Sequence, residues 1–160
     1  MKPNTLKKLT ITLTLLTNIS ACHSEDDTCK QLTGTWQGSV TDPHGLFGGT
    51  PAPITLKITH TKGNFFGISH TKNAIINNAL NHSFSGQCVN GKLIKVYLQN
   101  SSKCGHFAPA GKITGSQLTL FLPFENAMTG TDFVVKAKRV NTSPGKVPQF
   151  KTPAPLTTCH

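Results

Sequence analysis

Cysteine, histidine and acidic residues are the side chains of this chain that could do chemistry, and their spacing favours cross-linking over catalysis. The 160 residues include five cysteines, seven histidines and only six acidic residues. No cysteines form a Cys-x-x-Cys pair, so zinc binding and thioredoxin-like chemistry have little support. His60, His70 and His82 share no metal-ligand spacing, and we expect ordinary sheet histidines. Neither a catalytic Ser/His/Asp signature nor a paired-carboxylate site is evident. We therefore predict no enzyme, no cofactor and no metal site.

The first cysteine, Cys22, ends a segment that is typical of exported proteins. Lysines at positions 2, 7 and 8 precede a short apolar stretch over Leu9–Ile19, and the small residues Ser20 and Ala21 come next. A basic head, an apolar stretch and small residues describe a secretory signal. The stretch is shorter than the roughly 20 apolar residues that span a bilayer. The pattern resembles a bacterial lipoprotein signal, which implies cleavage before Cys22 and lipid on its sulfur.

Lipid on Cys22 would hold the protein at a membrane without a spanning helix. Because His23 rather than an acidic residue follows, the analogy with lipoproteins favours the outer membrane, facing the periplasm or the surface. The alternative is an ordinary signal peptide with Cys22 incidental.

The remaining cysteines, an even number in an exported chain, predict two disulfides. They are Cys29, Cys88, Cys104 and Cys159. Two pairings stay open: 29–88 with 104–159, or 29–159 with 88–104.

The chain is basic, with a formal net charge of +10 that is spread along the sequence rather than gathered in runs. An exported protein is a poor candidate for nucleic-acid binding, so we predict no nucleic-acid partner. Anionic lipid, peptidoglycan or lipopolysaccharide would be attracted, although a solvated basic surface is the simplest interpretation.

Short alternating segments separated by Gly, Asn and Pro predict an all-β fold. We expect eight strands, near 33–41, 54–60, 65–71, 82–88, 92–99, 106–114, 117–122 and 132–139. Such alternation, for example Ile94, Val96 and Leu98 on one face, fits an antiparallel sheet buried on one side. Eight strands in chain order close naturally into an up-and-down barrel.

The predicted connections alternate between short and long, so all the long ones meet at one end of the barrel. They span 42–53, 72–81, 100–105 and 123–131. The sequence therefore predicts a cup with a closed base and an elaborated mouth, where such barrels bind small ligands. We divide the chain into a signal peptide (1–21), a tether (22–31), the barrel (32–140) and a Pro-rich tail (141–160).

Several motifs within the predicted strands follow a known order. The first strand opens with Leu-Thr-Gly-Thr-Trp at 32–36, and a Gly-x-Trp there marks lipocalin-like barrels. Later motifs lie at 63–71, 84–87, 96–100 and 131–133. In this order and spacing they resemble the avidin/streptavidin family over roughly 29–139. The resemblance implies an eight-stranded barrel that binds biotin without catalysis and that can form a homo-oligomer.

The resemblance also implies a set of ligand-binding residues. Ser69 and Thr71 match polar positions of the family's third strand, and Asp132 lies one residue from the family's ureido-binding Asp. Leu98 and Phe121 fall at or near positions of cage tryptophans, with Tyr97 as the alternative to Leu98. The predicted ligand-binding residues are thus Ser69, Thr71, Leu98, Phe121 and Asp132.

Departures from the family bear on the ligand. Trp36 is the only tryptophan of the chain, and aromatic burial is a large share of such a site. Gly38 stands where the family has an Asn. We therefore expect biotin binding far weaker than the family's, or a different ligand.

The register of the third strand stays open, because a one-residue slip reverses every side chain. Either Phe65, Gly67, Ser69 and Thr71 face inward, as the resemblance favours, or Phe66, Ile68 and His70 do, as apolar content favours. Two functions follow. The first is a small-ligand-binding envelope lipoprotein, and the second is a structural or interaction module with a filled barrel.

Overall fold

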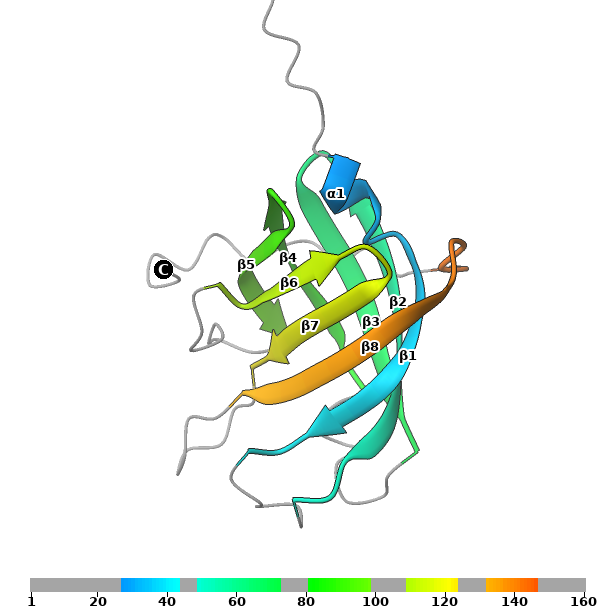
Figure 1. Cartoon of the computed structure of the whole chain (residues 1–160), viewed down its shortest axis with the longest axis vertical. Coiled ribbons are helices and arrows are strands. Elements are labelled where there is room, and N and C mark those ends of the chain that lie inside the picture. Colours follow the sequence, from blue (N-terminus) through cyan, green and yellow to red (C-terminus); the bar gives the residue numbers. More distant parts are fainter. Residues whose placement is uncertain (1–26, 44–48, 73–80, 99–108, 124–131, 147–160) are drawn as a thin grey trace, which may run out of the picture.

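The computed structural model describes residues 27–43, 49–72, 81–98, 109–123 and 132–146, and they build a closed barrel (Figure 1). A one-turn helix, α1 (Asp27–Lys30), comes first. The strands are β1 (Gly34–Thr41), β2 (Ala52–Thr61), β3 (Asn64–Thr71), β4 (Ser83–Val89), β5 (Lys92–Leu98), β6 (Gly111–Thr114), β7 (Gln117–Leu122) and β8 (Phe133–Asn141). Each pairs antiparallel with the next, and β1 pairs with β8. The predicted eight-stranded up-and-down barrel is confirmed.

Two tight turns fix the register of the neighbouring hairpins. Lys62 and Gly63 join β2 to β3, and Asn90 and Gly91 join β4 to β5; all four residues have positive φ. Two-residue loops with positive φ at both positions match the right-handed twist of paired strands. Both turns lie at one end of the barrel, which we call the base, and the longer connections start from the other end, the mouth.

The apolar interior follows the period-two pattern of the strands. On β2, Ile54, Leu56 and Ile58 are buried in alternation with more exposed residues. On β7 the buried residues are Leu118, Leu120 and Leu122. Apolar rows of this kind leave the other face of the sheet for polar side chains, so the alternation in the sequence predicts the core well.

β5 breaks the predicted alternation. We expected Ile94 inside with Val96 and Leu98, but Ile94 is half-buried on the outer face and Leu93 is buried instead. The pairing with β4 shifts register at this point, and Lys95 has a φ of 52°. An extra residue in the left-handed region is a β-bulge, which moves the preceding side chain to the opposite face.

β6 is shorter than the predicted strand at 106–114. It begins at Gly111, shortly after Pro109, and 106–108 lie outside the described residues. Proline lacks the N–H that a ladder needs. Ala110 still donates to the Leu93 carbonyl and accepts from the Phe121 N–H, so the two neighbouring strands remain bridged there.

Two glycines on β3 and β4 make room for aromatic rings. Phe65 pairs with Gly86, and Gly67 pairs with Phe84. A Cβ on Gly67 would meet the ring of Phe84, and a Cβ on Gly86 would lie 2.6 Å from Cζ of Phe65. The two rings meet edge to face with centroids 6.3 Å apart. Two of the motifs that suggested the avidin resemblance therefore have a packing role here.

The base is closed by α1 and by the start of β1. Cys29 and Leu32 are buried at this end of the barrel, which is at the top of Figure 1. The indole N–H of Trp36 donates to the Leu32 carbonyl at 2.9 Å. The guanidinium of Arg139 lies 5.8 Å from the Trp36 ring centroid and donates to the Gln31 carbonyl at 2.9 Å. Residues 27–31, which we expected in the tether, thus pack as a plug.

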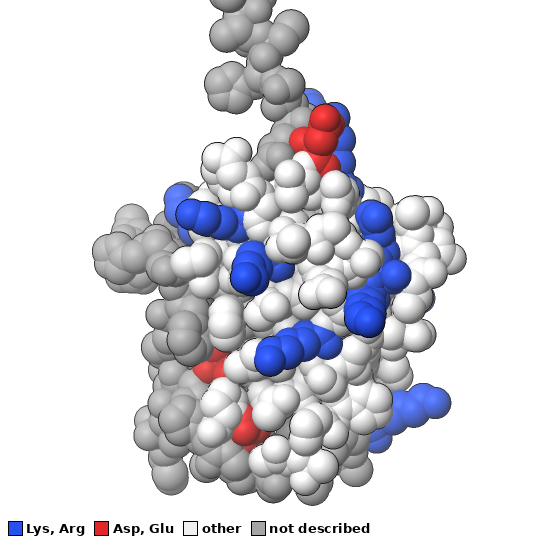
Figure 2. Space-filling view, viewed as in Figure 1, with Lys and Arg blue, Asp and Glu red and all other residues white. Residues whose placement is uncertain are grey.

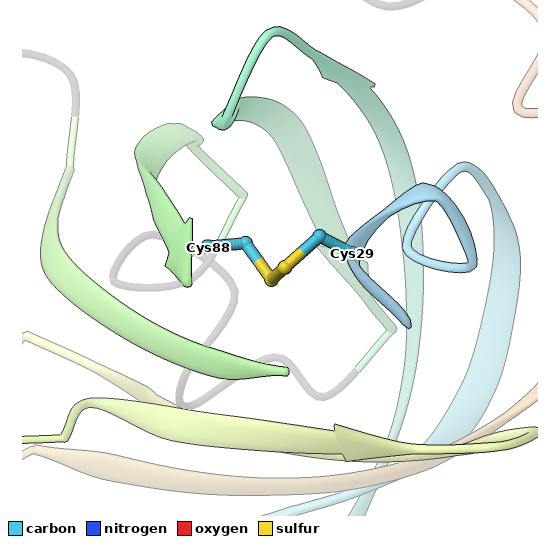
Figure 3. Close-up of a disulfide and its surroundings, with 2 residues drawn as sticks. All are labelled: Cys29 and Cys88. Atoms are coloured by element: carbon cyan, nitrogen blue, oxygen red, sulfur yellow. A yellow bond between two sulfur atoms is a disulfide. The ribbon is translucent and has the colours of Figure 1, made fainter. Parts of the chain in front are cut away.

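A disulfide between Cys29 and Cys88 fastens this plug to the end of β4 (Figure 3). The bridge belongs to the first of the two predicted pairings, and Cys104 and Cys159 lie outside the described residues. The predicted signal segment also lies outside them. Among the described residues, no helix is long and apolar enough to cross a membrane.

Candidate functional site

Polar side chains enter the barrel interior near its mouth. On β3 the inward-facing residues run from Phe65 and Gly67 near the base to Ser69 and Thr71 near the mouth. Ser69 and Thr71 are 1% and 2% exposed, whereas His70 between them is exposed. The structure therefore has the first of the two registers, and these two predicted site residues lie on the same inner face.

Hydrogen bonds anchor both hydroxyls to the wall of the mouth. Ser69 Oγ donates to the His82 carbonyl at 3.2 Å, and Thr71 Oγ1 donates to the Pro53 carbonyl at 2.8 Å. The Thr71 N–H donates to Asn81 Oδ1 at 2.8 Å. These bonds hold two polar side chains in fixed positions on the inner face near the mouth.

Two carboxylates lie at the mouth where β1 and β8 meet. Thr41 pairs with Val134, so Asp42 follows the end of one strand and Asp132 precedes the other. Asp132 is 1% exposed and Asp42 is 9% exposed. Asp132 is one of the predicted site residues, whereas Asp42 falls at the start of the predicted 42–53 connection. The signal for Asp42 was its position two residues after Val40, in step with the inward-facing row of β1.

The structure separates the two predicted cage positions. Leu98 is buried on the inner face at the mouth end of β5, next to Phe84 on β4. Phe121 is half-buried and alternates with the inward-facing Leu120 and Leu122, so it lies on the outer face of β7. The structure therefore brings Leu98, but not Phe121, to the inner face that holds Ser69. Tyr97, the alternative to Leu98, also lies on the outer face.

Gly38 marks a structural departure from the resembled family. A Cβ at this position would meet the carbonyl oxygen of Lys136, and it would lie 2.6 Å from the Cα of Ala137 on β8. The backbones of β1 and β8 approach too closely here for a side chain. A ligand contact equivalent to the family's Asn is therefore unavailable from this position.

No metal-binding group is evident in the part of the chain that the structure describes, where no three His, Cys, Asp or Glu side chains lie close enough together to hold an ion. Comparison with protein-family models, with curated proteins and with solved structures found no match. Fold and site geometry are therefore the basis for a functional argument.

Proposed function

We propose that this protein is a non-enzymatic binder of a small ligand, held at the mouth of an avidin-like barrel. The ligand would lie against Ser69, Thr71 and Leu98, with Asp132 at the rim. An eight-stranded barrel has room for one small molecule when side chains do not fill it.

The observation that carries this proposal is the change of polarity along the inner face of β3. Near the base the face is apolar, with Phe65 fully buried; near the mouth it carries the buried hydroxyls of Ser69 and Thr71. Buried polar groups cost free energy unless they are hydrogen-bonded. Both hydroxyls meet this condition through the His82 and Pro53 carbonyls, so they are held in place at little cost. Their position at the mouth end of an otherwise apolar inner face supports a binding role.

The lower interior limits the size of the ligand. Trp36 and Phe65 are fully buried and fill the base together with leucine and isoleucine side chains, and Phe84 is fully buried beside Leu98, nearer the mouth. The ligand would thus occupy only the half of the barrel nearest the mouth. A small ring-bearing compound with N–H donors fits this description, and biotin is the class suggested by the family resemblance. Without a tryptophan cage we expect weak binding.

Calorimetry and thermal shift with biotin at high protein concentration test the proposal. We expect a measurable heat for the natural chain and a loss of binding for Ser69→Ala and Thr71→Val. Thr59→Val, on the outer face of β2, is the matched control and should bind as the natural chain does. Equal binding by all the variants would show that the ligand does not bind at Ser69 and Thr71. No binding by any of them, the natural chain included, would exclude biotin as the ligand.

The second candidate function is a structural or interaction module, and the filled base is the observation that favours it. An experimental structure with no ligand-sized space beneath the mouth would support this alternative. Soaking the crystals with biotin and other small ureides would separate the two, because only the first proposal expects density between Ser69 and Leu98.

We also propose that the mature protein is lipid-anchored through Cys22 in a bacterial envelope, as the N-terminal sequence suggests. The Cys29–Cys88 disulfide supports an oxidising compartment. Fractionation and mass spectrometry of the exported protein test this. The natural chain should partition with membranes and carry acyl mass on residue 22, whereas Cys22→Ala should be released. An unmodified Cys22 would contradict the anchor.

A further inference from the structure

Lysines form a transverse row on the outside of the barrel, across four consecutive strands. Lys92 on β5 pairs with Lys112 on β6, Lys112 pairs with Thr119 on β7, and Thr119 pairs with Lys136 on β8. The three lysines are exposed. Lys138, also exposed, lies two residues along β8. Since neighbouring strands are about 4.8 Å apart, the backbone positions of the three lysines lie within roughly 15 Å.

Lys92 and Lys112 lie directly opposite each other on paired strands, which lowers the stability of the sheet. Like charges directly opposite each other on paired strands destabilise a sheet. No acidic side chain offsets them nearby among the described residues, where the acidic residues are Asp27 on α1 and the buried Asp42 and Asp132 at the mouth. Figure 2 shows this face, with blue patches over β6, β7 and β8 and red atoms only beside α1 and low on the molecule.

A shallow groove of about 430 Å³ runs beside the row, over β7, β8 and β1. Its polar lining consists of two lysines and four uncharged groups, all exposed except the half-buried Ser39 and Thr119: Lys136, Lys138, Gln37, Ser39, Gln117 and Thr119. Gly38 contributes only its backbone to this groove. Amide and hydroxyl groups recognise sugar hydroxyls, and ammonium groups recognise phosphate, sulfate or carboxylate.

We propose that this outer face binds an anionic carbohydrate polymer. The lysine row and the groove together complement a chain that carries both acidic groups and hydroxyls. No exposed aromatic or large apolar side chain lines the groove, which argues against insertion into a bilayer and against stacking on nucleic-acid bases. The proposal is independent of the ligand site at the mouth, because it uses the opposite face of the sheet.

Binding of the full chain to dextran sulfate, with uncharged dextran as reference, tests the proposal. We expect binding to dextran sulfate only, and weakening as salt screens the charges. The variant Lys112→Gln/Lys136→Gln/Lys138→Gln should bind about tenfold more weakly, since each exposed ion pair contributes modestly. Circular dichroism and the midpoint of thermal unfolding would show that the variant is folded.

A matched control removes the same charge elsewhere. Lys57→Gln/Lys62→Gln/Lys146→Gln takes three exposed lysines from other parts of the barrel, and it should weaken binding by less than about threefold because only its net charge changes. Equal losses in both variants would overturn the proposal in favour of non-specific attraction. Vesicles of anionic phosphatidylglycerol that bind more tightly than dextran sulfate, and that lose binding in the first variant only, would overturn it in favour of a membrane surface.

Discussion

At the scale of single residues, Arg139 joins three parts of the base. Its guanidinium lies over Trp36 and donates to the Gln31 carbonyl. The backbone N–H of Arg139 donates to the Ser116 carbonyl in the β6–β7 turn. A planar guanidinium can stack on a ring while its fork of donors reaches a carbonyl, which an ammonium group does less well.

Replacing Arg139 with Lys should therefore lower the free energy of unfolding although the charge is kept. We expect a loss of about 1–2 kcal/mol from the weakened ring contact and the lost hydrogen bond. Urea unfolding followed by tryptophan fluorescence measures it, because Trp36 is the only reporter in the chain. Lys57→Gln, an exposed substitution, is the control and should change stability by less than about 0.5 kcal/mol. An unchanged midpoint for Arg139→Lys would contradict this role.

The sequence predicted single site residues unevenly, for a physical reason. Ser69 and Thr71 were placed by the resemblance, but only the pairing of Thr61 with Asn64 across a two-residue turn decides that they face inward. Phe121 could not be placed in the same way, since a position carried over with an error of one residue changes the face of the sheet. Asp42 needed the end of β1, and strand ends are poorly defined by alternation alone.

At the scale of elements, the β3–β4 pair depends on reciprocal packing of rings over glycines. Gly67→Ala should destabilise the barrel by about 1–3 kcal/mol, because the added methyl group meets the Phe84 ring. Thermal and urea unfolding measure the loss.

A double-mutant cycle gives this prediction its control. In Phe84→Leu the ring that opposes the methyl group is gone, so Gly67→Ala should cost much less in that background. The same cost in both backgrounds would show that the glycine is needed for its backbone and not for the ring.

The plug is the second element with a measurable contribution. Replacing both Cys29 and Cys88 with serine should lower stability by roughly 2–4 kcal/mol, since the bridge closes a long loop of the unfolded chain; the bridged residues are 59 apart in sequence. Reduction by dithiothreitol should lower the stability of the natural chain by more than that of the double variant, because only the natural chain has the Cys29–Cys88 bridge to lose. A natural chain as stable when reduced as when oxidised would contradict this prediction.

At the scale of the whole molecule, we expect the lysine row to lower the stability of the barrel while it favours binding of the anionic polymer. Lys92→Thr removes the repulsion with Lys112 and adds a residue that favours strands. We expect a gain of about 0.3–1 kcal/mol at low salt, which shrinks as salt screens the charges, together with weaker binding to dextran sulfate. Unfolding midpoints at 20 mM and 500 mM salt measure the gain. Equal stability of the two proteins at low salt would show that the opposed lysines do not repel.

The fold class was predictable because alternation and turn residues repeat along the whole chain. The closed barrel, the order of its strands and the end at which the long connections meet all follow from that repetition. The plug did not follow from it, because a one-turn helix over Asp27–Lys30 leaves too short a pattern to detect. The groove beside Gly38 and the lysine row depend on which strands lie side by side, so they need the register of the sheet.

The disulfide at the base changes how the barrel would respond to a pull on its N-terminus. Load entering at Cys29 passes through the two sulfur atoms to Cys88 and leaves the 59-residue loop between them without tension. That loop contains β1, β2, β3 and nearly all of β4. A force between the N-terminus and the end of β8 at Asn141 would therefore peel β5 to β8 away and leave the first half of the barrel inside a covalent ring. In single-molecule extension, the unfolded chain should show a shorter contour length when the disulfide is intact than after reduction, because the loop inside the bridge is not extended.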